Sequence, residues 1–481
     1  MSAAPPTDET TKVLPKKGEE IEITIDSLAF GGQGVARMDG LVIFVPKGSA
    51  LPGSTVRAVV TRRKRGFVEA RPLEVLSPSP DAVDAPCRHF GVCGGCATQN
   101  LSYEAQLEQK QQQVADTFRR MGHFDDITIE PIIGCESIYH YRNKMEFTFS
   151  TRPWMVDMND PPPDRALGLH VPGRYDKVLD IQSCDLQHPV ATEILVWFKA
   201  HSAHLKPYDI KTHIGYLRYL VIRVARAGTD QLQVMVNIVT SHEKVDALKP
   251  LAEEMAAQFP QIVSVVNNVN TRKAAVAYGE WEVLLYGRPT MTEKLRGLEF
   301  EVSANAFFQT NPGQAEKLFE RIEAAAGLNG KETVFDLYSG AGAIALMLAR
   351  QAHEVVGFES VESAVDDAVR NAMTNEIFNA RFIRANLEGP YFTQEGKRLF
   401  KQVGQPDLLV ADPPRAGMHP KLVSDLLRLK AGKIVYISCN PATQVRDVRL
   451  LVDGGYQLTR IEPIDMFPQT PHIENICVLV R

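Results

Sequence analysis

The sequence predicts a multidomain α/β protein with a small antiparallel β-barrel, a central α+β domain and a C-terminal doubly wound α/β domain. Its 481 residues allow about three domains at roughly 150 residues each. Short β-rich runs with glycine-rich turns come first, and near-continuous apolar strands alternating with helices follow from about Ala304. The predicted boundaries are 1–17 for a flexible tail, 18–77 for the barrel, 78–303 for the central domain and 304–481 for the last domain.

The composition is typical of a globular protein, with 44% hydrophobic and 23% charged residues. The 53 Lys and Arg residues against 58 Asp and Glu residues give a net charge of −5, so a nucleic-acid contact surface would have to be local. No stretch approaches the roughly 18 consecutive apolar residues of a membrane span, and the N-terminus lacks the apolar core of a signal peptide. We therefore expect a cytoplasmic protein with no membrane partner. Its seven cysteines favour metal binding or thiol catalysis over a disulfide framework.

The first folded part begins near Ile21, after a tail rich in Pro, Thr, Lys and Glu. Its β-rich segments are IEITIDSLAF, LVIFVP, STVRAVV and GFVEARPLEVL, and turn-forming segments separate them, which predicts a small barrel ending near Leu76. One turn carries four consecutive cations. Such a run is usually a solvated surface, but beside a small barrel it indicates a phosphate-binding site for RNA. The residues are Arg62, Arg63, Lys64 and Arg65.

The central region begins after a proline-rich linker, SPSPDAVDAPC. The segment from Leu101 to Arg120 has Ser102 as a candidate N-cap and apolar residues at helical intervals, so it predicts an amphipathic helix. The segments KMEFTFS and DQLQVMVNIVT predict strands. The loop TRPWMVDMNDPPPDRA between them contains three consecutive prolines, which exclude regular structure there.

In the last domain, a glycine turn between a strand and a helix indicates a cofactor site. The string DLYSGAGA contains Gly340 and Gly342, and Glu359 ends the next strand. The glycines allow the backbone to approach a ligand, and an acid at the second strand end can bind ribose hydroxyls. This spacing fits NAD and S-adenosylmethionine equally well.

Two further strand ends favour the methyl donor. Asp412 is followed by Pro-Pro-Arg415, which places a carboxylate and a guanidinium at the sheet edge, and a dehydrogenase has no evident use for that pair. Cys439 lies in ISCNP, on a tight loop ahead of a helix, where backbone amides would favour its thiolate. Glu474 lies among apolar residues in PHIEN, where a carboxylate is costly unless it has a partner or a task.

A thiolate, a carboxylate base and a methyl-donor site together suit one reaction. C5 of uracil is a poor nucleophile until a thiolate adds at C6, and the resulting enolate attacks an electrophilic methyl group. A base must then remove the C5 proton so that the thiolate can leave. The interpretation makes Cys439 the nucleophile and Glu474 the general base.

The strings FFQTN, DLYSGAG, ADPPRAG, ISCNP and PHIEN, in this order, resemble the SAM-dependent RNA uracil-C5 methyltransferases. The resemblance runs from about Ile21 to the C-terminus. It implies a Rossmann-like methyltransferase domain and an OB-like TRAM domain that binds RNA. It also implies a set of residues that hold S-adenosylmethionine or organise its pocket. They are Gln309, Tyr338, Gly340, Gly342, Glu359, Asn386 and Asp412.

Four cysteines form a candidate metal site, namely Cys87, Cys93, Cys96 and Cys184. Zinc and an iron-sulfur cluster both accept four thiolates, so spacing alone leaves both open. The strings CRHFGVCGGC and SCDL resemble the branch of the family that acts on 23S ribosomal RNA, which implies a structural or RNA-positioning 4Fe-4S cluster.

Other functions explain less of the sequence. A NAD-dependent oxidoreductase would leave the DPPR and SCNP strand ends without a role, and a non-catalytic RNA-binding factor would keep an unused active site. A cytosine-C5 methyltransferase would share the thiolate chemistry, but its usual Pro-Cys loop is missing. We therefore expect a monomeric enzyme that methylates a flipped or unpaired uridine in 23S ribosomal RNA, with transfer RNA as the alternative substrate.

Overall fold

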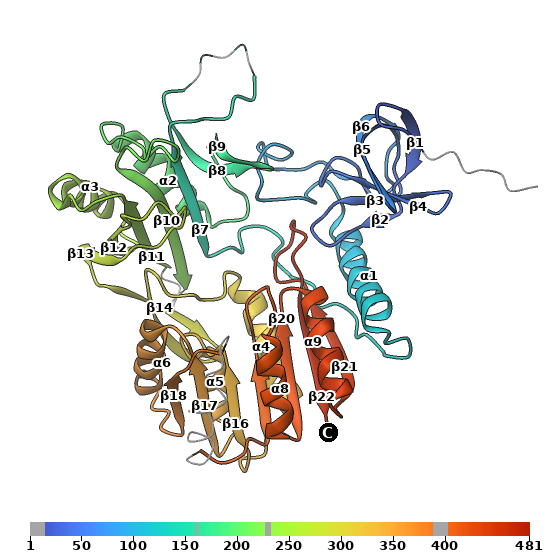
Figure 1. Ribbon diagram of the computed structural model, residues 1–481. Helices are drawn as coiled ribbons and strands as arrows, with labels where there is room; N and C mark the ends of the chain where they lie inside the picture. Colours follow the sequence, from blue (N-terminus) through green and yellow to red (C-terminus); the bar gives the residue numbers. More distant parts are fainter. Residues whose placement is uncertain (1–14, 158, 160, 162, 227–231, 388–402) are drawn as a thin grey trace, which may run out of the picture. The chain divides into compact units, whose positions relative to one another are not determined.

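The computed structural model describes residues 15–157, 159, 161, 163–226, 232–387 and 403–481, which fold into two compact units (Figure 1). The N-terminal unit contains the described residues up to Ala85, together with Cys96–Gln109 and Gln469–Pro471. The main unit contains the rest. Most of the predicted flexible tail, residues 1–14, lies outside the described residues. No helix in the described ranges is long and apolar enough to cross a membrane.

The N-terminal unit is built on a six-stranded sheet in the order β1-β5-β6-β4-β3-β2. The strands are β1 (Glu20–Thr24), β2 (Ser27–Leu28), β3 (Gly34–Met38), β4 (Leu41–Val45), β5 (Thr55–Lys64) and β6 (Phe67–Ser77). Alternate residues of β1 and β5 point inward, and Ile23, Val56 and Ala58 lie in the core of the unit.

This sheet differs from the predicted antiparallel barrel in two respects. Strands β4 and β6 pair in parallel, and the sheet stays open with β1 and β2 at its edges. Strand β2 has only two residues, so it offers few backbone groups with which to close a barrel. The strand runs and the end of β6 at Ser77 agree with the sequence prediction.

Helix α1 (Tyr103–Gly122) is the predicted amphipathic helix. The Ser102 hydroxyl accepts a hydrogen bond from the Ala105 backbone N–H at 3.4 Å, which is the predicted cap. Val114 and Phe118 are fully buried on the apolar face of the helix. The boundary between the two units falls within this helix. Tyr103–Gln109 belongs to the N-terminal unit, and the residues from Lys110 onward belong to the main unit.

The central part of the main unit has a seven-stranded sheet in the order β13-β12-β11-β10-β7-β8-β9. Its strands are β7 (Lys144–Ser150), β8 (Ala166–Val171), β9 (Arg174–Asp180), β10 (Leu217–Arg226), β11 (Leu232–Thr240), β12 (Ile262–Val269) and β13 (Trp281–Gly287). Helices α2 (Pro189–His201) and α3 (Val245–Gln258) pack with this sheet in one apolar core. The predicted proline-rich loop joins β7 to β8 and has no helix among its described residues.

A hairpin and a helix lead from the central part to the last sheet. They are β14 (Thr290–Leu295), β15 (Leu298–Ser303) and α4 (Pro312–Ala326). The Asn311 side chain caps α4 by accepting a hydrogen bond from the Gln314 backbone N–H. The domain boundaries assigned from the sequence stay predictions.

The last sheet is mostly parallel, as predicted, in the order β18-β17-β16-β19-β20-β22-β21. Its strands are β16 (Thr333–Leu337), β17 (Glu354–Glu359), β18 (Ala380–Arg384), β19 (Leu408–Ala411), β20 (Lys433–Ser438), β21 (Gln457–Ile464) and β22 (Glu474–Val480). Its helices are α5 (Ala343–Ala349), α6 (Glu362–Thr374), α8 (Pro420–Leu429) and α9 (Pro441–Asp453). Strand β22 runs antiparallel to both of its neighbours. Its first residues therefore lie at the edge where β19 and β20 end.

Candidate active site

Three of the predicted site residues meet at this edge of the last sheet. Asp412 directly follows β19, Cys439 directly follows β20, and Glu474 begins β22. Ser438 pairs with Asn475 across the β20–β22 ladder, so Cys439 and Glu474 lie at adjacent ends of neighbouring strands. The reversed direction of β22 thus brings the predicted base to the predicted nucleophile.

The Cys439 thiol is partly buried, and its pKa is raised to about 11. Burial is the main cause, and the carboxylates of Glu474 and Asp412 raise the pKa further, while the Arg415 guanidinium lowers it. The sequence-based expectation of a favoured thiolate is therefore wrong for the protein without substrate. The loop does precede a helix, and the Asn440 side chain caps α9 by accepting the Ala442 N–H at 3.1 Å.

Both carboxyl groups of the site also have raised pKa values. Burial raises the pKa of Glu474 well above its ordinary value, Asp412 raises it further, and Arg415 opposes both. Burial raises the pKa of Asp412 to about 7. A carboxylate with a raised pKa is a stronger base once it is ionised, so both groups suit proton transfer.

Arg415 is a member of the site that sequence reasoning did not include among the site residues. Its backbone carbonyl accepts hydrogen bonds from Asn440 Nδ2 at 3.0 Å and from Thr443 Oγ1 at 3.2 Å, which ties the DPPR loop to the cysteine loop. Its guanidinium Nη2 lies 3.4 Å from His472 Nδ1. The sequence feature that could have identified Arg415 is its position in the loop that follows a strand, three residues after Asp412.

The candidate cofactor turn follows β16. Gly340 and Gly342 have φ of 52° and 85°, and Tyr338 also has a positive φ, of 65°. The Gly340 backbone N–H donates to Glu359 Oε2 at 3.0 Å, and the other oxygen of Glu359 accepts the backbone N–H groups of Ser360 and Val361. A Cβ added at Gly340 would meet open space. The turn therefore leaves the Gly340 backbone uncovered on the side where a side chain would lie.

A buried acid lies beneath this turn and was also missed as a site residue. Asp336 in β16 is fully buried, and the backbone N–H of Ala345 is close enough to lower the pKa of its carboxyl group. Burial raises its pKa well above the ordinary value, and the Asp412 and Glu359 carboxylates raise it further. Asp336 is thus close enough to Asp412 and Glu359 for their charges to affect its protonation, which links the turn to the catalytic edge.

The other predicted cofactor residues are placed by the strand ladders. Leu337 pairs with Ala411, so Tyr338 and Asp412 follow their strands at equivalent positions. The Ala385 N–H donates to the Glu359 carbonyl at 2.8 Å, and the exposed Asn386 comes next along the chain. Tyr338, Glu359, Asn386 and Asp412 therefore share one edge of the sheet. The half-buried Gln309 lies before α4, where its carbonyl accepts Asn143 Nδ2 at 3.2 Å.

Three of the four predicted metal ligands, Cys87, Cys93 and Cys184, belong to the main unit, and Cys96 belongs to the N-terminal unit. Burial raises the pKa of Cys184, with a further contribution from Cys87, and Cys93 Sγ accepts the Gly95 N–H at 3.4 Å. In the N-terminal unit, Cys96 Sγ accepts Gln99 Nε2 at 3.1 Å. Across the described part of the chain, no group of three or more His, Cys, Asp or Glu side chains could hold a metal ion. Four thiols are a ligand type that fits a 4Fe-4S cluster, and the cluster stays a prediction.

The cationic run lies at the tip of the β5–β6 hairpin in the N-terminal unit. All four of its residues are exposed. Arg62 lies 3.7 Å from a Glu69 carboxylate oxygen, and the Lys64 ammonium lies 5.5 Å from the centre of the Phe67 ring. The cations are thus displayed at the surface, as a phosphate contact requires.

Comparisons with known proteins agree with these features. Residues 233–481 match the family described as tRNA (Uracil-5-)-methyltransferase, and residues 15–73 match the TRAM domain. A protein of Chlorobaculum tepidum named "Uncharacterized RNA methyltransferase" is 40% identical over 98% of this chain and 99% of its own. A protein of the same name from Porphyromonas gingivalis is 40% identical, and the match covers 95% of this chain and 99% of that protein.

A solved structure shares the fold over nearly the whole chain. It is the Pyrococcus abyssi tRNA (uracil-54, C5)-methyltransferase in complex with S-adenosyl-L-homocysteine. It is 28% identical, with a TM-score of 0.72, and the match covers 96% of this chain and 100% of the other.

Proposed function

Because the chain belongs to the tRNA (uracil-5-)-methyltransferase family of SAM-dependent RNA methyltransferases, we propose that it methylates C5 of a uridine through a covalent adduct on Cys439. The observation that carries this mechanism is the meeting of a thiol, two carboxyl groups of raised pKa and a guanidinium at one sheet edge. The roles of Cys439 and Glu474 are proposals made from this geometry.

The first step is addition of Cys439 Sγ to C6 of the uracil ring. The S–C6 bond forms, and the C5=C6 electron pair moves into an enolate. The thiol must lose its proton first, and its pKa of about 11 means that little thiolate exists at neutral pH. The Arg415 guanidinium favours the thiolate, and Asp412, with a pKa of about 7, is a base of suitable strength to accept the proton.

The second step releases the product. S-adenosylmethionine, when bound, would supply the electrophilic methyl group that C5 acquires, and S-adenosylhomocysteine would leave. Glu474 then removes the C5 proton, the C5=C6 bond forms again, and the S–C6 bond breaks to return the thiolate. The raised pKa of Glu474 suits this removal, because its carboxylate binds a proton more strongly than an ordinary glutamate does.

We propose that the strand-end residues and the glycine turn hold the cofactor. The set comprises Gln309, Tyr338, Gly340, Gly342, Glu359, Asn386 and Asp412. The open space against Gly340 supports this assignment. The Gly340 N–H already binds Glu359, which fixes that carboxylate beside the turn.

The substrate we propose is 23S ribosomal RNA, on the resemblance of the cysteine motifs to that branch of the family. A second candidate is transfer RNA, which the Pyrococcus abyssi enzyme modifies. The TRAM match supports an RNA substrate in either case, and we propose that the Arg62–Arg65 run contacts its phosphates. We further propose a monomer, and a 4Fe-4S cluster whose only support is the resemblance and the ligand type.

One experiment tests reaction, substrate and roles together. Purified protein is incubated with radiolabelled S-adenosylmethionine and either unmodified 23S ribosomal RNA or transfer RNA. We expect label in 5-methyluridine of one RNA, no transfer with Cys439→Ala, and a denaturation-resistant protein–RNA adduct with Glu474→Gln. Cys135→Ala is the control for removal of a half-buried thiol and should keep activity. Undiminished transfer by Cys439→Ala would refute the covalent mechanism.

A further inference from the structure

The segment that leads into Glu474 is the loop Asp465–Ile473, between β21 and β22. Ile464, the last residue of β21, pairs with Glu474 across the ladder. Asp465 therefore lies one position beyond the cross-strand partner of the proposed base. Whatever fixes Asp465 also fixes the place at which Glu474 leaves the loop and enters the sheet.

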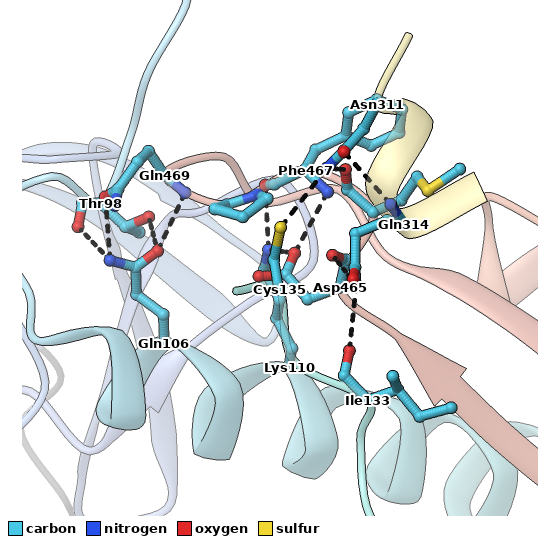
Figure 2. Close-up of polar contacts among 12 residues, drawn as sticks. Thr98, Gln106, Lys110, Ile133, Cys135, Asn311, Gln314, Asp465, Phe467 and Gln469 are labelled. Carbon is cyan, nitrogen blue, oxygen red and sulfur yellow. Dashed lines mark hydrogen bonds and ion pairs between the residues drawn. The ribbon is translucent and has the colours of Figure 1, made fainter. Parts of the chain in front are cut away.

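Helix α1 holds this position with a buried ion pair in the main unit. Lys110 Nζ lies 2.5 Å from Asp465 Oδ1 and donates to the Phe467 carbonyl at 3.2 Å (Figure 2). The two charged side chains are 4% and 0% exposed. Because both side chains are almost fully buried, the ammonium holds two residues of the loop at once.

Two other segments, one at Ile133 and one at the start of α4, also hold the backbone of this loop. Asp465 N–H donates to the Ile133 carbonyl at 2.9 Å, and the Asp465 carbonyl accepts Gln314 Nε2 at 2.8 Å. Asn311 Nδ2 donates to the Met466 carbonyl at 3.0 Å (Figure 2). Helix α4 and the Ile133 segment thus supply a neutral frame, to which Lys110 adds a charged contact with Asp465.

The next part of the loop is held separately in the N-terminal unit. Gln469 and Gln106 exchange two hydrogen bonds of 3.0 Å, from Gln469 N–H to Gln106 Oε1 and from Gln106 Nε2 to Gln469 Oε1 (Figure 2). The Gln469 carbonyl also accepts the Ala97 N–H at 2.9 Å. Gln469 is therefore held by Gln106 and Ala97 within the N-terminal unit.

Stability alone does not explain a buried lysine at this place. Taking two charges out of water largely cancels their attraction, and well-packed apolar residues often stabilise a core as well or better. The pair constrains the position of the loop, because the ammonium must contact both the Asp465 carboxylate and the Phe467 carbonyl. The loop that it directs ends at the proposed general base.

We propose that Lys110 is a positioning residue for Glu474: its ion pair with Asp465 sets the start of β22 so that the carboxylate reaches the C5 proton. The inference rests on the proposed function. It makes Lys110 important for release of the adduct and not for its formation, since Cys439 is carried by β20 and α9, which Lys110 does not hold.

The test measures the two steps separately in pre-steady-state reactions of the full chain with the RNA that it methylates. In Lys110→Met we expect adduct formation close to the wild-type rate and release of 5-methyluridine slowed by about 10- to 100-fold, the scale of a misplaced catalytic group. Arg120→Met is the matched control, because it removes an exposed cation paired with Asp116 on the same helix. The control should leave both steps unchanged.

A second variant guards against misfolding, since Lys110→Met leaves the Asp465 charge without its cation. Asp465→Asn keeps the shape and an acceptor oxygen, and it should slow release selectively by a smaller factor. Release at the wild-type rate in both folded variants, or an equal fall in formation and release, would overturn the inference. If the wild-type protein forms no adduct and Glu474→Gln traps none, the proposed function itself fails.

Discussion

Replacing Gly342 by alanine should destabilise the protein more than replacing either of two other glycines. Gly342 has a φ of 85°, where an alanine costs about 1–2 kcal/mol because its Cβ approaches the backbone. A Cβ there would also lie 2.8 Å from the Phe382 ring and 3.1 Å from the Ala368 Cβ. Forcing these groups apart costs a further 1–3 kcal/mol or so. We therefore expect the free energy of unfolding to fall by about 2–5 kcal/mol in Gly342→Ala.

Gly340 and Gly330 separate this packing effect from the backbone effect and from cofactor binding. Their φ values are 52° and 90°, and an added Cβ at either would meet nothing within 4 Å. Both alanine variants should be destabilised by about 1–2 kcal/mol. Of these two glycines, Gly340 lies in the proposed cofactor turn and Gly330 does not, so Gly340→Ala should also weaken binding of S-adenosylmethionine, whereas Gly330→Ala should not.

Denaturant unfolding of each variant gives the stability changes, and calorimetric titration with S-adenosylmethionine gives the dissociation constants. If Gly342→Ala is no less stable than Gly330→Ala, the packing argument at Phe382 is wrong. If Gly340→Ala binds S-adenosylmethionine as the wild type does, the open space against that turn does not receive the cofactor.

Three further predictions concern the site and the partners. The rate of methyl transfer should rise from about pH 6 to about pH 9, because Glu474 and Cys439 become reactive by losing protons and both have raised pKa values. Equal rates at both ends of a pH–rate profile would contradict this prediction. Replacing Arg62–Arg65 by alanines should weaken RNA binding and reduce the slope of log K against log salt by roughly 0.7 to 0.9 for each phosphate that the protein no longer neutralises, as filter-binding titrations would measure. Metal analysis of the purified protein should find iron and sulfide rather than zinc; stoichiometric zinc without iron would rule out the 4Fe-4S cluster.

Much of the fold was predictable because it depends on local patterns. The capped helix α1, the strands of the last sheet and the glycine turn each follow from side-chain periodicity or from backbone freedom. The predicted barrel was wrong about closure and strand direction, because pairing between β4 and β6 joins residues distant in the sequence. Local patterns predict strands, but they do not say which strands pair.

The candidate site shows the same division. The strand-end motifs identified Cys439, Asp412 and Glu474 as chemical groups, because each motif combines a reactive side chain with a turn. Their pKa values depend on burial and on one another, and these came from the fold: the sequence favoured a thiolate, whereas the thiol is held protonated by its buried, acidic surroundings. Asp336 was missed because its burial beneath the turn is a tertiary property.

The sequence by itself determined the chemical groups, their motifs and hence the family, since these are properties of short segments. Only the tertiary structure decided that β22 runs against its neighbours and returns Glu474 to the edge that carries Cys439. It also placed Lys110 against Asp465, 355 residues away in the chain. Contacts of this kind depend on which surfaces pack together, so no local pattern of residues encodes them.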